Sequence, residues 1–273
     1  MSRIPASLRL VRSTLVAATL CLGAVAANAS ALILGAPNAS GQAGLVDIQK
    51  KISATGLISG SVDIFDVGNA TPTLAQLSAY DAVLVFSDRA YSSATLLGNV
   101  LADFVDAGGG VVEAGLSHFT VGLRGLSGRF VTGNYDVFNS TLYQAACGTL
   151  GTVALPGSPL MAGIDAINAA TGQCNNRLTL KAGSTLVASW STGQPLAAYR
   201  LDHNAPVVGL NFYPVSGDAS PGQWDSSTDG ALLMANALAF VSPRVNAVPE
   251  PGSLALLAIA GLAAFAVRRR REA

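Results

Sequence analysis

The sequence predicts an α/β domain with a mainly parallel sheet over residues 30–243, with mixed strands in the second half. Short apolar runs that suit buried strands alternate with longer segments whose apolar residues recur at helical spacing. The connections between them are short, which favours right-handed crossovers between parallel strands. A domain of roughly 215 residues is long enough to bury a sizeable core.

The first half of the domain alternates strands and helices. Residues 31–35 form a continuous apolar run, which is typical of a strand covered on both faces. Residues 44–54 repeat apolar side chains at helical spacing, and glycines 108–110 end a second predicted helix at residues 94–106. The other elements predicted here are strands at 61–67 and 82–86, a helical turn at 73–77 and a strand that begins at Val111.

The second half is more mixed. Residues 117–150 contain many glycines and predict loops and short hairpins, and residues 158–164 predict a compact turn. Residues 229–241 carry an apolar stripe and predict a helix that packs back on the sheet. Three further strands are predicted at 184–190, 197–200 and 207–212.

Several segments carry a resemblance to a known family of domains. They are Leu74-x-x-Leu77-x-x-Tyr80-Asp81-x-Val83, Leu101-x-x-Phe104-Val105-x-x-Gly108-Gly109-Gly110-Val111-Val112, Pro159-Leu160-x-x-Gly163-Ile164 and Leu232-Leu233-x-x-Asn236-Ala237-Leu238. Together they resemble class I glutamine amidotransferase-like domains, including the ThuA-like branch, over residues 31–241. The resemblance implies a flavodoxin-like three-layer fold.

One departure from that family concerns catalysis. Its true members carry a cysteine nucleophile on a tight turn after a central strand, with a histidine and a glutamate further on. The corresponding stretch, residues 111–118, contains no cysteine. Because there is no thiol to activate, the thioester mechanism is excluded. We therefore expect a binding or structural module that needs no cofactor.

A hydrolase acting on a surface glycan or a small amide is the alternative. Ligands of open α/β sheets bind beyond the carboxyl ends of the strands, where Asp88, Ser117 and His118 follow predicted strands. Asp88 could orient His118 while Ser117 or a water attacks, which requires contacts of about 3 Å. Otherwise Asp88 and Arg89 cap a helix or pair with each other, and Ser117 and His118 lie in a polar loop.

A second group of residues suggests ligand binding. Asn38 and Arg89 follow predicted strands, and Trp190 and Tyr213, with Trp224, could offer ring faces on which a sugar stacks. The alternative is that Trp190 belongs to the core and that Trp224 fixes the loop before the last helix.

The C-terminal segment has three parts in a fixed order. A Pro-Glu-Pro motif in a linker at residues 244–253 precedes an apolar run at 254–267, and four arginines open the final segment, 268–273. As a helix the apolar run would reach about 21 Å, short of the ~30 Å hydrocarbon core of a bilayer. It would span only by thinning the membrane or by letting the arginines reach the surface. The motif residues are Pro249, Glu250 and Pro251.

This arrangement resembles the sorting tag of PEP-CTERM proteins. The resemblance implies cleavage by an exosortase in a Gram-negative bacterium that makes extracellular polysaccharide. It also implies an inner-membrane intermediate with a cytoplasmic basic tail, followed by a cell-surface or extracellular protein, with the polysaccharide as a possible partner. An ordinary tail anchor and a terminal helix packed on the domain are the alternatives.

The N-terminal segment predicts export as well. Three arginines precede an apolar run at residues 15–27, which ends in Ala27-Asn28-Ala29, the pattern of a signal peptidase site. Cleavage after Ala29 would remove a signal peptide, residues 1–29, and leave Ser30 first. A retained N-terminal anchor is the alternative.

Removing both end segments changes the charge. Without three N-terminal and four C-terminal arginines, and without Glu250 and Glu272, 9 basic residues remain against 14 acidic ones. The processed chain is then acidic, which argues against binding to nucleic acid.

The cysteines suit an oxidising compartment. Cys21 lies in the predicted signal, so the processed chain keeps Cys147 and Cys174, an even number that favours one disulfide. Two buried free thiols, or a reactive Cys147 with a distant base, are the alternatives. Two cysteines without metal-ligand spacing predict no zinc site, and no other metal motif occurs.

Overall fold

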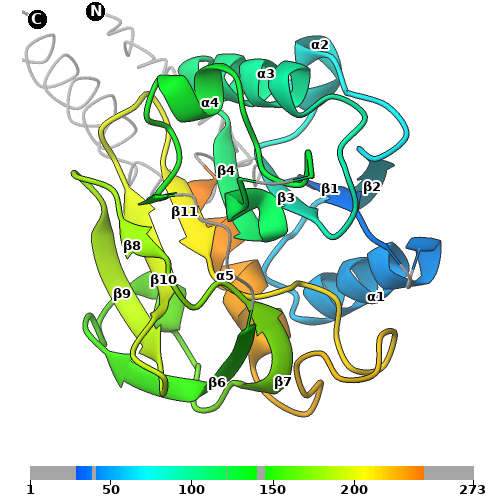
Figure 1. Cartoon of the computed structure of the whole chain (residues 1–273). Coiled ribbons are helices and arrows are strands. Elements are labelled where there is room, and N and C mark those ends of the chain that lie inside the picture. Colours follow the sequence, from blue (N-terminus) through cyan, green and yellow to red (C-terminus); the bar gives the residue numbers. More distant parts are fainter. Residues whose placement is uncertain (1–28, 39–40, 121, 140–144, 243–273) are drawn as a thin grey trace, which may run out of the picture.

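A nine-stranded sheet forms the centre of the computed structural model, which describes residues 29–38, 41–120, 122–139 and 145–242 (Figure 1). The strand order is β2-β1-β3-β4-β11-β10-β9-β6-β7. One half of this sheet is parallel and the other antiparallel. The predicted α/β class, mainly parallel first and mixed afterwards, is therefore confirmed.

Four of the five parallel strands come first along the chain, and the fifth, β11, is the last strand of all that the structure describes. Strands β1, β3 and β4 are buried along their whole length, because helices cover both faces of the sheet. This burial is why their sequences are continuous apolar runs instead of alternating patterns. The parallel strands are β1 (Ala31–Ala36), β2 (Val62–Asp66), β3 (Ala82–Ser87), β4 (Gly110–Gly115) and β11 (Val207–Leu210).

Two helical layers enclose the sheet (Figure 1). On one face α1 (Gly41–Ala54) and α5 (Gly230–Val241) bury their apolar side chains in one core. On the other face α2 (Leu74–Leu77), α3 (Ala94–Asp106) and α4 (Arg129–Thr132) cover a second core. The sheet thus separates two apolar layers, as the predicted three-layer fold requires.

The antiparallel half contains strands that the sequence did not predict. Residues 145–150 were expected in loops and short hairpins, but they belong to β6, which pairs with β9 and with β7. The sequence of β7 is Asn-Ala-Ala-Thr-Gly-Gln-Cys, which has little intrinsic strand preference, so pairing with β6 determines its structure. The elements here are β6 (Ala145–Val153), β7 (Asn168–Cys174), β9 (Thr185–Trp190) and β10 (Pro195–Arg200), and the small sheet of β5 (Phe138–Asn139) and β8 (Thr179–Leu180).

Glycines at residues 108–110 have two separate roles. Gly108 has a φ of +94°, a conformation that ends α3 and that other residues rarely adopt. Gly110 begins β4, and a Cβ there would lie 2.2 Å from the carbonyl oxygen of Val241. The last turn of α5 therefore packs directly on the start of β4.

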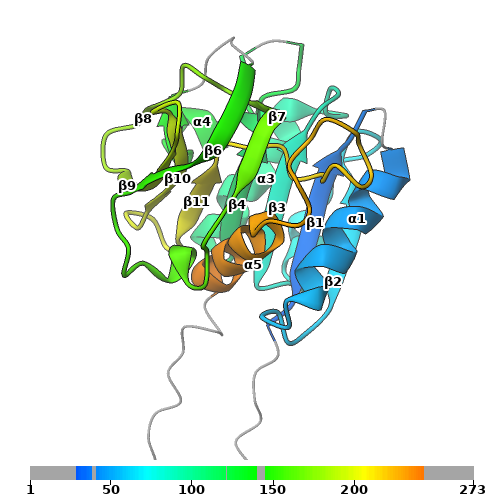
Figure 2. The same ribbon diagram turned by 90° about the horizontal axis from the view of Figure 1, so that it is seen from below.

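The two ends of the described chain lie on the same side of the molecule (Figure 2). Ala29 precedes β1, and Ser242 follows α5 beside the start of β4. In the described ranges no helix combines the length and the apolar character that crossing a membrane demands. The predicted signal up to Asn28 and the predicted tail helix at 254–267 lie outside those ranges.

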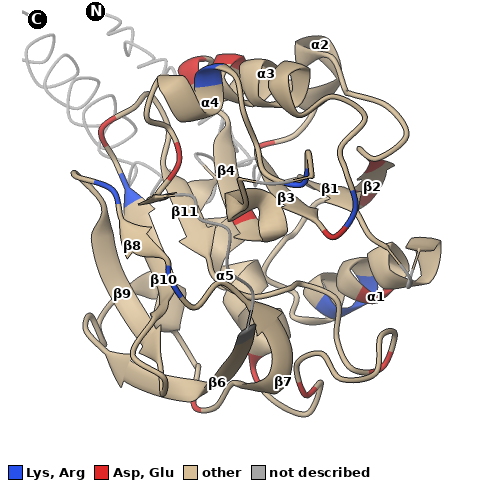
Figure 3. Cartoon of the chain, in the orientation of Figure 1, with Lys and Arg blue, Asp and Glu red and all other residues tan. Residues whose placement is uncertain are grey.

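Charged residues are scattered along the helices and loops in the ribbon of Figure 3. Within the described part of the chain, the Lys and Arg segments, in blue, are short and separated from one another. This agrees with the acidic balance calculated from the sequence.

Candidate functional site

The turn after β4 lies at the carboxyl edge of the parallel strands, where ligands of this fold class bind. Gly115 forms this turn with φ 59° and ψ −133°, and a short 3-10 helix, η1 (Leu116–His118), follows directly. A side chain at Gly115 would have space, since its nearest neighbours lie 3.5 Å away, so the positive φ is what favours glycine. The turn itself therefore provides no nucleophile.

His118 lies inside the core with Glu113 as its partner. Its Nδ1 is 3.1 Å from Oε1 of Glu113, and both side chains are at most 2% exposed. The imidazole also packs edge-on against Phe138, with ring centroids 5.0 Å apart. Nε2 of His118 and Oε2 of Glu113 are buried and have no hydrogen-bond partner among the residues that the structure describes. The imidazole is therefore oriented by a carboxylate, but it is closed off from solvent.

The strand pairing explains why this polar pair is enclosed. Glu113 lies opposite Gly209 of β11, where a Cβ would be only 2.4 Å from the Phe138 ring. Without that Cβ the ring comes close to the sheet and covers the pair. We did not select Glu113 from the sequence. The signal was a single acidic residue inside an apolar strand, since such residues are seldom buried without a partner.

Ser117 is also buried, and its hydroxyl is used within the fold. It donates to the carbonyl oxygens of Ala114 at 2.7 Å and Val85 at 3.2 Å. The hydroxyl of Tyr91 lies 3.0 Å away, and burial raises the pKa of this phenol. Ser117 thus has structural partners, and no hydrogen bond joins its side chain to that of His118 in the described part of the chain.

Asp88 does not take the position that the hydrolase alternative gives it. Nδ1 of His118 contacts Glu113, and no hydrogen bond connects Asp88 with His118. Partial burial raises the pKa of Asp88, while the charge of Arg124 lowers it. Glu113, and not Asp88, therefore lies in the position from which a carboxylate orients the His118 imidazole.

Arg89 joins the loops that follow β1 and β2. Its guanidinium donates to both carboxylate oxygens of Asp66 at 2.8 and 2.9 Å and to the Pro37 carbonyl at 3.2 Å. It lies over Gly68, where a Cβ would be 2.2 Å from its Cζ. Of the two predicted ligand-binding residues here, Arg89 is thus engaged in the fold, whereas Asn38 is exposed.

The aromatic residues belong to the core, which corrects the prediction of a sugar-stacking face. Trp190 and Tyr213 are only 1% and 2% exposed, and Trp224 is equally buried. The indole of Trp190 donates to the Asn211 carbonyl at 2.9 Å, and Tyr213 packs edge-on against Phe86. These rings therefore offer no face to a ligand.

Cys147 and Cys174 are not joined by a disulfide in this structure, and both are buried. They lie on the paired strands β6 and β7, where Cys147 hydrogen-bonds with Cys174 and its Sγ lies 3.6 Å from the Gly172 carbonyl oxygen. Burial raises the pKa of the Cys147 thiol. The predicted disulfide stays a prediction. No group of three histidine, cysteine or acidic side chains suited to a metal occurs among the residues that the structure describes.

A buried acid lies near the His118 pair, under the small sheet of β5 and β8. Oδ1 of Asp136 is 2.5 Å from Nζ of Lys181, and Arg200 donates to the Asp136 backbone carbonyl at 2.9 Å. Burial raises the pKa of Asp136 to about 6, with a further contribution from the charge of Glu113, although Lys181 acts in the opposite direction. The folded protein thus binds a proton at Asp136 more tightly than the unfolded chain does.

Asp136 should make the protein more stable at mildly acidic pH. Because the pKa of Asp136 is higher in the folded protein than in the unfolded chain, its protonation stabilises the fold at pH values below the unfolded pKa near 4. This contribution is lost as the pH rises through the folded pKa of about 6. We expect the unfolding free energy of the wild type to fall relative to Asp136→Asn by up to about 3 kcal/mol between pH 4 and 7. Urea unfolding of both proteins across this range measures the difference, and parallel profiles would contradict it.

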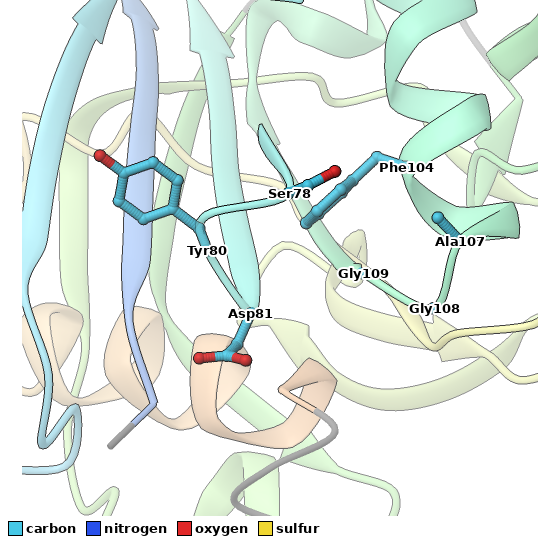
Figure 4. A pocket seen from close by; sticks show the side chains of 7 residues that line it. All are labelled: Ser78, Tyr80, Asp81, Phe104, Ala107, Gly108 and Gly109. Carbon is cyan, nitrogen blue, oxygen red and sulfur yellow. The ribbon is translucent and has the colours of Figure 1, made fainter. Parts of the chain in front are cut away.

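The described cavities do not coincide with the predicted catalytic residues. One of about 190 Å³ opens at the opposite, amino edge of the strands and is lined by Tyr80, Asp81, Phe104 and Gly108 among others (Figure 4). Another of about 280 Å³ lies above the carboxyl edge and is mainly apolar, with Phe119, Leu126 and Val131 in its wall. Ser117 and His118 line neither of them.

Comparison with known proteins identifies the C-terminal segment. Residues 247–271 match the PEP-CTERM protein-sorting motif. The PEP-CTERM match marks the chain as an exported protein that is sorted through an exosortase. A search of curated proteins gives no match.

The described domain is similar in fold to solved ThuA-like proteins. One from Bacteroides uniformis has a TM-score of 0.55 at 13% identity and covers 80% of this chain and 93% of its own. Another, from Parabacteroides merdae, has a TM-score of 0.51 at 12% identity, with 79% and 90% covered. A β-galactosidase from Rahnella sp. R3 has a TM-score of 0.51 at 16% identity, and the match covers 81% of this chain and 32% of that enzyme. The chain thus combines a domain of ThuA-like fold with a C-terminal segment that matches the PEP-CTERM sorting motif.

Proposed function

We propose that this chain is a cell-surface or extracellular-matrix protein whose ThuA-like domain is a non-catalytic binding or structural module. The observation that supports it best is the closed turn after β4. Gly115 occupies that turn, and Ser117 and His118 are each 1% exposed. An attacking group and its base must reach the substrate, and these residues have no opening to it.

The hydrolase alternative requires a different arrangement of the same residues. Asp88 would have to replace Glu113 at His118, and the covering ring of Phe138 would have to move. Hydrolysis of a glycan or amide by the purified protein, abolished by His118→Gln in a variant that remains folded, would favour the hydrolase over the module.

The ligand of the module is proposed to be an extracellular polysaccharide. This part of the proposal now rests on the sorting motif, because Trp190, Tyr213 and Trp224 lie in the core. Calorimetry with the polysaccharide of the producing organism measures whether the domain binds this ligand. Absence of binding would leave a structural role for the exported domain.

The sorting step gives a prediction about the Pro-Glu-Pro motif. We expect simultaneous replacement of Pro249, Glu250 and Pro251 by alanine to keep the protein cell-associated, because the sorting enzyme would no longer recognise the tail. Intact mass measures this: the wild type should lose its C-terminal residues, and the variant should retain them.

A matched control replaces Pro243 by alanine, which changes a proline upstream of the motif. This variant should be processed and released as the wild type is. Equal processing of the triple-alanine variant would contradict the assignment of the motif as the recognised element.

A further inference from the structure

The residue that signal peptidase cleavage would expose is bound to a buried carboxylate. The backbone nitrogen of Ser30 donates to Oδ2 of Asp81 at 2.8 Å, and the Ser30 hydroxyl donates to the same oxygen at 3.3 Å. Asp81 is 4% exposed. In return, the backbone N–H groups of Asp81 and Ala82 donate to the Ser30 carbonyl at 3.0 and 3.4 Å. Ser30 is thus fixed from both sides by the start of β3.

Cleavage before Ser30 would change the chemistry of this contact. Water adds to the Ala29 carbonyl carbon as the C–N bond breaks, which leaves a carboxylate on Ala29 and an amine on Ser30. That amine takes up a second proton near neutral pH, since free α-amino groups have a pKa of about 7.7–8.0. The neutral donor at 2.8 Å from Asp81 would become a cation.

We propose that Asp81 is the binding site for the α-ammonium group of the processed chain, so that the fold recognises its own mature N-terminus. This proposal rests on the export described under the proposed function. Charge-assisted hydrogen bonds are stronger than neutral ones, and solvent hardly reaches the carboxylate that would accept this one. Figure 4 shows Asp81 at the amino end of β3, with its carboxylate directed away from the Tyr80 ring.

Ala29 is 1% exposed and has two hydrogen bonds that cleavage would remove. Its carbonyl accepts from the Gly60 N–H at 2.7 Å, and its own N–H donates to the Ser59 hydroxyl at 3.2 Å. Ser59 is exposed and Gly60 half-buried, so water can replace both contacts. Water cannot replace Ser30 at Asp81 as easily, because Asp81 is buried whereas Ser59 is exposed and Gly60 is half-buried.

Other ionisable groups at this edge are engaged elsewhere. The carboxylate of Asp63 accepts from the Tyr80 hydroxyl at 3.0 Å and from Ser61 at 2.9 Å, and Asp106 pairs with Arg129 at 2.6 Å. The last turn of α5 contains no basic residue. Asp81 is therefore the acid that we expect to control the protonation of a Ser30 amine.

The test measures how fast the N-terminal amine reacts with an acylating reagent, because only the unprotonated amine reacts. Chains 30–273 and 29–273, released from a cleavable N-terminal fusion and kept in mild detergent, are compared folded and in urea at pH 8. At this pH the Ser30 amine should react about fivefold more slowly in the folded chain, which corresponds to a pKa raised by about one unit from its ordinary value of about 7.7–8.0. The Ala29 amine should change less than twofold.

Asp81→Asn in the 30–273 chain separates charge from burial. If burial only shields the amine from the reagent, the variant should react as slowly as the wild type, whereas the proposed ion pair predicts that the slowing disappears in the variant. Equal rates in wild type and variant, with circular dichroism showing both folded, would overturn the proposal. N-terminal sequencing of the exported protein should give Ser30, and a start further upstream would overturn it too. These results are independent of the tail-processing experiment, which tests the proposed function.

Discussion

Replacing Trp190 by alanine is expected to lower the free energy of unfolding by about 3–5 kcal/mol. The side chain is 1% exposed, and it packs edge-on against Phe212, with ring centroids 6.5 Å apart. Its removal leaves a cavity and also leaves the Asn211 carbonyl without the indole N–H that donates to it at 2.9 Å. Urea unfolding monitored by circular dichroism measures the loss.

The matched variant Trp190→Phe separates packing from ligand binding. The phenylalanine variant keeps a ring in the core, so its unfolding free energy should fall by only part of the amount expected for Trp190→Ala. Any binding of polysaccharide by the wild type should persist in it. Loss of binding in a phenylalanine variant of wild-type-like stability would restore the stacking role that the burial of Trp190 argues against.

Oxidation of the Cys147–Cys174 pair should have the second large effect. Cys147 lies on β6 and Cys174 on the paired strand β7, and the two thiols are already hydrogen-bonded to each other. In the chain-entropy model, closing a loop of this length stabilises the protein by about 3 kcal/mol. Unfolding of the exported protein with and without a reducing agent measures this difference, and intact mass should show the loss of two hydrogens.

The control for the disulfide is Cys174→Ala, which leaves a single thiol. Its unfolding free energy should be the same with and without the reducing agent. A wild type that shows equal stability under both conditions, with both thiols open to alkylation after unfolding, would contradict the disulfide.

The parallel half of the sheet could be predicted because its strands are buried on both faces. The apolar runs at β1 and β3 and the helical spacing in α1 and α3 are local patterns, and each occurs close to its predicted place. β7 could not be predicted in this way. It lies at the end of the sheet order beside β6, and the pairing that makes it a strand comes from residues distant in sequence.

The candidate site shows the same division. Asp88, Ser117 and His118 were placed correctly at strand ends, since element order alone gives that edge. Their contacts depend on the strand neighbours of β4. Gly209 admits the ring of Phe138, so His118 is enclosed with Glu113 and does not meet Asp88.

The sequence by itself determined the export tag, the α/β order and the absence of a cysteine from residues 111–118, because each depends on which residue stands at which position. Only the tertiary structure decided that Trp190 and Tyr213 are core residues and that His118 is closed off. An aromatic ring or an imidazole at the end of a strand can face either solvent or the interior. Which of the two occurs depends on neighbouring strands and loops that are distant in the sequence. The placement of Ser30 beside Asp81 depends on such a neighbour as well.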